Sequence, residues 1–395
     1  MTIDKNRTFA TLSDSLDEFT RIRRDLHKHP ETAFEETRTS DLVAKELESY
    51  GLEVHRGLAR TGVVATLRSG PSERAIGLRA DLDALPMDEA NEFDHRSCYR
   101  GKMHGCGHDG HTTMLLAAAR YLSRHRDFDG TVHFIFQPAE ENEGGGRHMV
   151  EQGLFDLFPM EAVFGMHNMP GIPLGDFAVR AGPIMGGFDV FDIVVRGQGS
   201  HAAMPHYSRD PLLAAAAIVT AAQSIVARNV DPMQSAVVSV TQFHGGSAYN
   251  VIPDEVRLAG TARYFLPAVQ DMIERRLREL AENVAKAHEV TATVSYQRRY
   301  PATVNTAREA ELCRQVLTRT FGEDRVDAAP VPMLGSEDFA FMLEAKPGCY
   351  IWAGNGVDSR MVHHPKYDFS DDLIPYGATY WVELVKECLP LARKI

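Results

Sequence analysis

The sequence predicts an α/β protein in which a second, smaller domain is inserted into a larger one. In the first third of the chain, short apolar strands alternate with amphipathic helices, a pattern typical of an open mixed sheet covered by helices. The middle of the chain follows the order β-α-β-β-α-β, which is that of the ferredoxin-like unit. At 395 residues, the chain is also longer than a single hydrophobic core usually serves.

The larger domain is expected to start with two helices. The first passes through Phe19 and Leu26 and ends at Pro30, because proline cannot continue a helix. Gly51 ends the second, since glycine readily adopts the left-handed conformation that follows a helix. The expected elements are, in order, a helix from Ser13 or Asp14, a helix at 37–50, strands at 62–67 and 75–79, a helix after His111 and a strand at 131–136.

The inserted domain has a different order of elements. It is expected to contain a strand at 188–196, a helix at 211–228, strands at 235–243 and 256–265, a helix at 267–288 and a strand at 290–296. The second helix carries Ile273, Leu277 and Val284 on one stripe, so that face should be buried. The expected bounds are 184–298 for the inserted domain and 1–183 with 299–395 for the larger domain, which ends in a helix at 375–391.

The composition restricts the class of partner. The formal net charge of −12 disfavours binding to nucleic acids and to anionic membrane surfaces. The apolar run at 212–222 is shorter than the roughly 20 residues of a membrane-spanning helix, and the polar N-terminus lacks the apolar core of a signal peptide. Five scattered cysteines do not indicate a disulfide framework. We therefore expect a cytoplasmic protein, while the charge says nothing about a small substrate.

The segment 103–111 is the most informative part of the chain. It places a thiol, three imidazoles and a carboxylate within nine residues, and its glycines allow tight turns. Cys106 and His108 are two residues apart and can both point at one transition-metal ion. A thiolate combined with an imidazole suits a borderline-soft ion such as zinc.

Further groups of this kind follow expected strands. Glu140 and Glu141 come after the strand at 131–136, and His167 comes after a short apolar run. Such side chains meet where an open α/β sheet gathers its site, at the carboxyl ends of its strands. Adjacent glutamates can divide the work, because one can hold a metal while the other takes a proton from water. Together with a histidine pair at 363–364, these groups predict a metal-dependent hydrolase.

The inserted domain contributes three candidates that are weak when taken alone. His201 lies between a strand and a helix start, Asn250 precedes a short apolar run, and Arg263 lies in a strand. A turn histidine and a surface arginine are the more common interpretation of such residues. They become relevant because a hydrolase needs a donor to the developing oxyanion and a cation for an anionic substrate.

The chain resembles the M20 family of metallopeptidases and amidohydrolases, in particular the branch with hippurate hydrolase, N-acyl amino acid amidohydrolases and plant auxin-conjugate hydrolases. The ordered set of matching segments runs nearly end to end. These segments are Leu26-His27-Lys28-His29-Pro30-Glu31, Arg79-Ala80-Asp81-Leu82-Asp83-Ala84-Leu85-Pro86, Cys106-Gly107-His108-Asp109-Gly110-His111, Gln137-Pro138-Ala139-Glu140-Glu141, Ser200-His201-Ala202, Asn250-Val251-Ile252-Pro253 and Gly335-Ser336-Glu337-Asp338-Phe339.

The resemblance implies roles for the candidate residues. Glu140 would be the general base, and Asp81 would support a ligand. The family pattern His-X-Pro favours His363 over His364 as a ligand. The implied ligands of a two-metal site are Cys106, His108, Glu141, His167 and His363.

One departure from the wider family concerns two positions. The wider M20 family has a histidine and a bridging aspartate where this chain has Arg79 and Cys106. That departure fits the amidohydrolase branch and leaves open whether Cys106 bridges two metals.

The implied activity is metal-dependent hydrolysis of N-acyl amino acids, hippurate-like substrates, to a carboxylic acid and a free amino acid. The cofactors would be two divalent ions per subunit, manganese or zinc, with nickel and cobalt as alternatives. The inserted domain would serve as a lid and dimerisation domain in a homodimer or homotetramer. His201 would donate to the oxyanion, in its own or a neighbouring subunit's site, while Asn250 and Arg263 hold the substrate carboxylate. The alternatives are a dipeptidase or carboxypeptidase of the same family and a non-catalytic ligand-binding relative.

Overall fold

The computed structural model describes residues 7–141 and 143–391, and the chain divides into two compact units. Unit 1 consists of Met1–Ile184, Val304–Val331 and Asp338–Ile395, and unit 2 of Met185–Thr303 and Pro332–Glu337. The short segment Pro332–Glu337 belongs to unit 2, although the sequence pattern had placed it in the larger domain. The prediction that the polar N-terminus lacks the apolar core of a signal peptide concerns the start of the chain. The first six residues there lie outside the described part.

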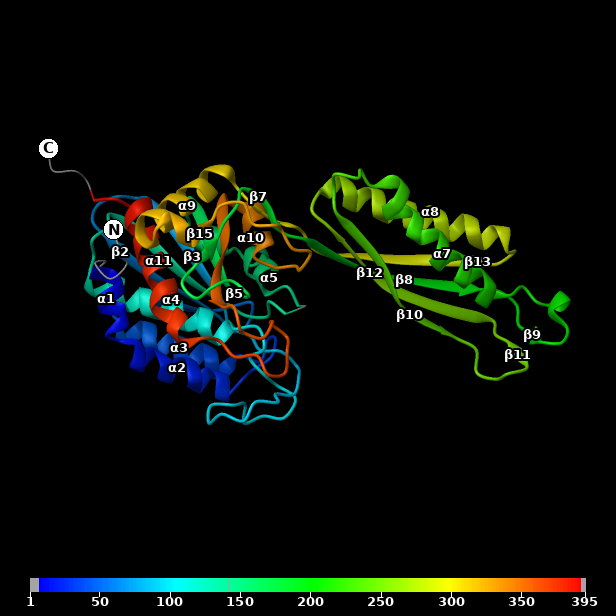
Figure 1. The fold of residues 1–395 in the computed structure, drawn as a ribbon, viewed down its shortest axis with the longest axis horizontal. Coiled ribbons are helices and arrows are strands. Elements are labelled where there is room, and N and C mark those ends of the chain that lie inside the picture. The colour runs from blue at the N-terminus through cyan, green and yellow to red at the C-terminus, as the bar shows by residue number, and fades with distance from the viewer. Residues whose placement is uncertain (1–6, 142, 392–395) are drawn as a thin grey trace. The chain divides into compact units, whose positions relative to one another are not determined.

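Unit 1 is built on a mixed eight-stranded sheet, as the sequence predicts (Figure 1). The strand order is β1-β2-β4-β3-β5-β16-β6-β15. Pairing is parallel from β4 through β3 and β5 to β16, whereas β1, β2 and β4 pair antiparallel. The strands are β1 Glu53–Leu58, β2 Gly62–Ser69, β3 Ala75–Asp81, β4 Gly130–Gln137, β5 Ala162–Pro170, β6 Phe177–Ala178, β15 Val326–Asp327 and β16 Gly348–Gly356.

The helices of unit 1 bury the central strands. All residues of β3 are buried, which is typical of a parallel strand covered on both faces. Helices α4 and α11 pack against each other and both contact β3 (Figure 1). The helices are α1 Arg7–Ser13, α2 Leu16–Lys28, α3 Thr37–Ser49, α4 His108–Arg124, α5 Gly145–Glu151, α6 Leu154–Leu157, α9 Ala307–Phe321, α10 Ala340–Ala345 and α11 Ile374–Cys388.

Two parallel strands end side by side where the predicted site lies. Asp81 is the last residue of β3 and pairs with Gln137, the last residue of β4. Glu140 and Glu141 follow β4 directly, as expected. His167 differs from the expectation, because β5 continues to Pro170 and the histidine therefore lies within the strand. Within unit 1, these strand ends bring the acidic residues to one edge of the sheet.

Unit 2 has the predicted β-α-β-β-α-β order. Its four strands are antiparallel in the order β10-β12-β8-β13, and α7 and α8 pack against each other and against the sheet. A small pair, β9 Ser200–His201 with β11 Val251–Ile252, extends from it (Figure 1). The main elements are β8 Gly187–Arg196, α7 Pro211–Asn229, β10 Ala236–Gly245, β12 Glu255–Tyr264, α8 Pro267–Ala287 and β13 Thr291–Tyr300.

Helix α7 passes the length and hydropathy criteria for a membrane-spanning helix. It has 19 residues and a mean hydropathy of 1.5 over its most apolar window, so the apolar helix is longer than the run at 212–222 suggested. However, Ala214, Ile218 and Ile225 on one of its faces belong to the core of unit 2. A third of its most apolar window, 33%, is buried within the described structure.

The packing of α4 gives a test of unit 1. Leu116 is fully buried in its core, so Leu116→Ala should lower the free energy of unfolding by about 2–5 kcal/mol. Leu157 on α6 is 54% exposed, and Leu157→Ala should change it by less than about 0.5 kcal/mol. Urea denaturation followed by tryptophan fluorescence measures unit 1 selectively, because Trp352 and Trp381 both lie there. Equal losses for the two variants would contradict this packing.

Candidate metal centre

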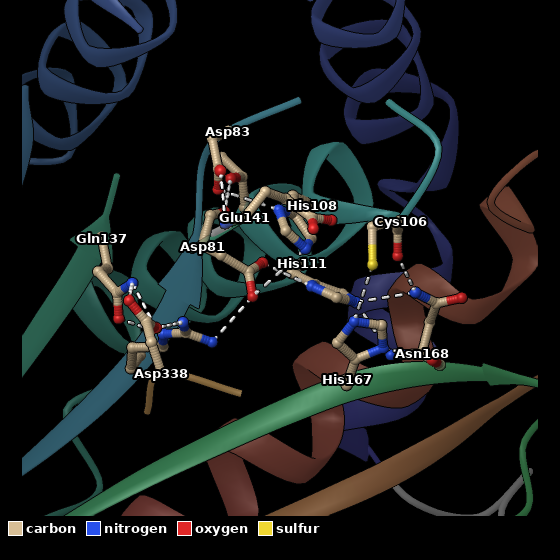
Figure 2. Close-up of polar contacts among 12 residues, drawn as sticks. Asp81, Asp83, Cys106, His108, His111, Gln137, Glu141, His167, Asn168 and Asp338 are labelled. Atoms are coloured by element: carbon tan, nitrogen blue, oxygen red, sulfur yellow. Dashed lines mark hydrogen bonds and ion pairs between the residues drawn. The ribbon is translucent and has the colours of Figure 1, made fainter. Parts of the chain in front are cut away.

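Cys106, His108 and His167 come together at the start of α4. Their ligand atoms lie within 4.8 Å of one another, and Cys106 Sγ is 3.3 Å from His167 Nε2 (Figure 2). Gly107 makes this approach feasible, because a Cβ there would lie 2.3 Å from Asn168 Nδ2, and its φ of 93° is left-handed. The turn before α4 thus presents the thiol and the first helical histidine to β5.

A second group consists of Cys106, Glu141 and His363, again with ligand atoms within 4.8 Å of one another. His363 Nε2 lies 3.2 Å from Glu141 Oε1. His363 has a φ of 65°, unusual for a residue with a side chain, and its N–H donates to Gly105 O at 2.7 Å. His364 instead accepts a hydrogen bond from the N–H of Lys366 through Nδ1 at 3.0 Å. Cys106 therefore belongs to both groups, whereas His364 belongs to neither.

The pair Glu140 and Glu141 lies close to His108, which is a member of the first group. Donor atoms of His108, Glu140 and Glu141 lie within 4.8 Å of one another, and Glu140 is buried. The Glu141 N–H donates to Asp83 Oδ2 at 2.9 Å. The two glutamates thus present carboxylates at one place from consecutive positions of one turn.

Hydrogen bonds leave the Nε2 atoms of His108 and His167 pointing into the cluster. His167 donates from Nδ1 to the carbonyl of Asn168 at 2.6 Å, which leaves the Nε2 lone pair available in the neutral ring. His108 Nδ1 lies 3.2 Å from Asp83 Oδ1 (Figure 2). His108 Nε2 is buried and has no hydrogen-bond partner among the described residues. A carboxylate or carbonyl behind each imidazole is the usual arrangement for histidine ligands of metals.

The electrostatics of the cluster favour a bound cation. Burial first, and then the charges of Glu141 and Glu140, raise the pKa of the Cys106 thiol well above its ordinary value. Burial would lower the pKa of His108, but Asp81 and Asp83 outweigh it and raise that pKa to about 10. Burial, and then the charge of His111, lower the pKa of His167 well below its ordinary value, so its ring is neutral. A thiolate here needs a positive charge beside it, and the orphaned His108 Nε2 fits a metal ligand.

Asp81 lies behind the cluster and contacts it indirectly. Its Oδ1 is 2.6 Å from His111 Nδ1 and its Oδ2 accepts from Arg79 at 2.8 Å, whereas His108 Nε2 is 3.8 Å away. His111 Nε2 in turn accepts from the N–H of Asn168 at 2.9 Å. Asp81 therefore holds His111, and through Asn168 it orients the segment that carries His167.

Asp83, His111 and Asn168 are contacts that the sequence reasoning did not assign. Asp83 was visible in the same motif as Asp81, and His111 in the same segment as Cys106. The signal for Asn168 was its position directly after His167. None of these positions reveals which neighbour its side chain contacts.

The side chain of Arg79 connects the ends of strands β3 and β4. Its guanidinium donates to Gln137 Oε1 at 2.9 Å and to Asp338 Oδ1 at 3.0 Å, and all three side chains are buried. Asp338 Oδ2 also accepts from the Gly146 N–H at 2.7 Å. The Arg79–Asp338 ion pair and the Arg79–Gln137 hydrogen bond thus join β3, β4 and the start of α5.

The remaining predicted residues all lie in unit 2. His201 pairs with Val251 across β9 and β11, and the Ala202 N–H donates to Asn250 O at 2.9 Å, so His201 and Asn250 are neighbours and both are exposed. Arg263 lies near the other end of β12, with its guanidinium 4.1 Å above the Phe188 ring. Unit 2 therefore brings His201 and Asn250 together but separates Arg263 from them.

Comparison with known proteins identifies the family. The sequence pattern of peptidase family M20/M25/M40 matches residues 77–387. Hippurate hydrolase of Campylobacter jejuni is 38% identical over 372 residues, covering 94% of this chain and 97% of that protein. IAA-amino acid hydrolase ILR1-like 2 of Arabidopsis thaliana is 40% identical over 392 residues, covering 96% of this chain and 87% of that protein.

The fold agrees with that assignment. A solved structure from Bacillus subtilis, described as a dinuclear metal-binding peptidase of family M20, is similar with a TM-score of 0.83 and 32% identity, covering 94% of this chain and 98% of that chain. The present chain belongs to the M20/M25/M40 peptidase family. It is a hydrolase of amide bonds, and the resemblance drawn from its motifs is confirmed.

A buried ion network anchors the start of α4 from the opposite side. His27 lies between Asp109 Oδ2 at 2.8 Å and Glu89 Oε1 at 3.1 Å. Burial would lower the pKa of His27, but these hydrogen bonds outweigh it and raise that pKa to about 9. Burial would raise the pKa of Asp109, but Arg23 and His27 outweigh it and hold that pKa well below its usual range. A charged pair therefore fixes the residue that follows His108.

This network gives unit 1 a pH-dependent stability. His27 has a pKa of about 9 when folded and 6.5 as the reference value, so its contribution is complete below pH 6.5 and is lost as the pH rises to about 9. The free energy of unfolding of metal-stripped protein should fall across that window by about 2–3 kcal/mol more than that of His27→Gln. Urea denaturation with tryptophan fluorescence at several pH values measures the difference. Parallel pH profiles for the two proteins would refute the assignment.

Proposed function

We propose that this amidohydrolase cleaves N-acyl amino acids of the hippurate type into a carboxylic acid and a free amino acid at a two-metal centre. The central support is one cluster in unit 1, in which Cys106 is shared by two groups of metal-binding side chains. Glu140 lies beside both groups as an additional carboxylate. The residues that would hold the two ions are Cys106, His108, Glu141, His167 and His363.

The proposed chemistry assigns the proton transfers to Glu140. Its carboxylate takes a proton from water, and the resulting hydroxide attacks the amide carbonyl carbon. The tetrahedral intermediate collapses by breaking the C–N bond, and Glu140 returns the proton to the leaving nitrogen. His201 would donate an N–H to the oxyanion. The metal ions, when bound, would polarise the carbonyl and lower the pKa of water.

The substrate class is inferred from two relatives. Their names, hippurate hydrolase and IAA-amino acid hydrolase, both denote an acyl group joined to an amino acid.

A buried thiol among imidazoles and carboxylates suits manganese or zinc, with nickel and cobalt as alternatives. All five cysteines are free, which supports a reducing, cytoplasmic setting.

A homodimer follows if Asn250 and Arg263 hold one substrate carboxylate. From Glu255, at the end of β12 near β11, to Arg263 is about 26 Å along an extended strand. The two side chains of one subunit therefore cannot reach the same carboxylate. We propose that residues of two subunits hold one substrate carboxylate, with His201 and Asn250 supplied by one subunit and Arg263 by the other.

The general base gives the sharpest prediction. Glu140→Gln keeps the size of the side chain but cannot take a proton, so kcat should fall by about 10³-fold or more while two metal ions still bind. Steady-state kinetics and metal analysis of the purified variant test both parts. Glu143→Gln is the matched control, since Glu143 is exposed in the same loop, and its kcat should be near normal. A near-normal kcat for Glu140→Gln would rule out the general-base role.

Metal removal tests the centre and the substrate together. Protein stripped by a chelator should release no amino acid from N-acyl glycines and other N-acyl amino acids, and reloading with Mn²⁺ or Zn²⁺ should restore release. Dipeptides with a free α-amine, assayed in parallel, distinguish a dipeptidase. Metal binding without hydrolysis of either substrate class would favour a non-catalytic relative.

A further inference from the structure

The turn that carries the glutamate pair contains a strained residue. Ala139, directly before Glu140, has a φ of 55°, in the left-handed region that residues with a Cβ avoid at a cost of about 1–3 kcal/mol. The turn closes tightly, because the Gly145 N–H donates to Ala139 O at 2.9 Å, and a Cβ at Gly145 would lie 1.7 Å from Pro138 O. A hydrogen bond from outside the turn would help to offset the cost of this conformation.

Glu36 supplies that contact from a distant part of unit 1. The Ala139 N–H donates to Glu36 Oε1 at 2.9 Å, and both residues are fully buried. The same oxygen accepts from the Phe34 N–H at 3.1 Å, and Oε2 accepts from Thr61 Oγ1 at 2.7 Å. Three donors thus fix the carboxyl group in front of the turn.

The side chain of Glu36 is not needed by its own helix. Glu36 occupies the N-cap position of α3, yet its side chain makes no capping hydrogen bond. Glu31 performs that task, because it accepts from the Arg38 N–H at 3.0 Å and the Thr39 N–H at 2.8 Å. The carboxyl group of Glu36 therefore binds the N–H of Ala139 in the turn, together with the N–H of Phe34 and the hydroxyl group of Thr61.

We propose that Glu36 is a positioning residue, which holds the left-handed Ala139 turn so that Glu140 and Glu141 face the metal centre. The inference rests on the function proposed above, in which Glu140 is the base and Glu141 a ligand. Asp83 anchors the other side of the pair through the Glu141 N–H at 2.9 Å. Two buried carboxyl groups thus hold the backbone here, Glu36 at the N–H of Ala139 and Asp83 at the N–H of Glu141.

The hydrogen-bond acceptor, rather than the charge, is the property that the turn needs. Burial and the charge of Asp83 raise the pKa of Glu36 to about 7, so the neutral form is accessible near neutral pH. Glutamine keeps an acceptor oxygen for Ala139 and Phe34, and its amide can donate to Thr61. Glu36→Gln should therefore preserve the turn, whereas Glu36→Ala removes the acceptor and leaves a buried N–H unpaired.

The test compares variants in kinetics, cobalt binding and stability. Glu36→Ala should lower kcat by about 10–100-fold with KM within about threefold, and should weaken Co²⁺ binding to the metal-stripped protein by about 10–100-fold. Glu36→Gln should stay within about threefold of wild type in both. Glu31→Ala is the matched control: it should lower the urea midpoint but leave kcat and Co²⁺ affinity within about threefold of wild type.

The outcomes separate this inference from the proposed function. Glu36→Ala with normal kcat and Co²⁺ affinity, beside an inactive Glu140→Gln, overturns the positioning role alone. An active Glu140→Gln overturns the proposed function itself. Glu36→Gln as damaged as Glu36→Ala also overturns the acceptor role. If Glu36→Ala does not fold, Thr61→Val, which removes the donor to Oε2, should lower kcat by about threefold or more, and no change overturns the proposal.

Discussion

Buried negative charge at the ends of β3 and β4 is the constraint on which the site depends. Asp81, Asp83 and Glu140 are all buried there, and isolated buried carboxylates are costly unless hydrogen bonds or cations compensate them. Asp81 is met by Arg79 and His111. Asp83 is met by a ring nitrogen of His108 and a backbone N–H. A cation held beside Cys106 would compensate this negative charge from the side of the thiol.

Much of this arrangement could be predicted because its signals are local in the sequence. The periodicity of apolar residues predicted the mixed sheet and the ferredoxin-like unit, and the short spacing from Cys106 to His108 predicted their meeting. The place of Glu140 and Glu141 at the site was predicted from their position after a strand. The extension of β5 through His167 was missed, because polar residues at 167–168 read as a strand end, whereas the strand pairs onward with β16.

The unpredicted contacts all depend on long-range geometry. Asp81 and Asp83 are both acidic and two residues apart, so the sequence does not reveal that Asp83 contacts His108 Nδ1 whereas Asp81 contacts His111 Nδ1. Glu36 meets a backbone N–H 103 residues away, and a backbone donor leaves no mark in the sequence. Likewise, Arg263 is separated from Asn250 because Glu255–Tyr264 forms one extended strand, which the spacing of the two residues along the chain does not reveal.

The exposure of His363 bears on how readily metal ions bound at the proposed centre would exchange. Its side chain is 53% exposed and hangs from a loop, whereas Cys106, His108 and His167 are buried on α4, its leading turn and β5. Rotation of one loop side chain can open the position that includes His363. Opening the position formed by Cys106, His108 and His167 requires a core helix or strand to move. At the proposed two-metal centre, the two positions would therefore be kinetically unequal: an ion at the position that includes His363 would exchange readily, and an ion held by Cys106, His108 and His167 would be retained as long as unit 1 stays folded.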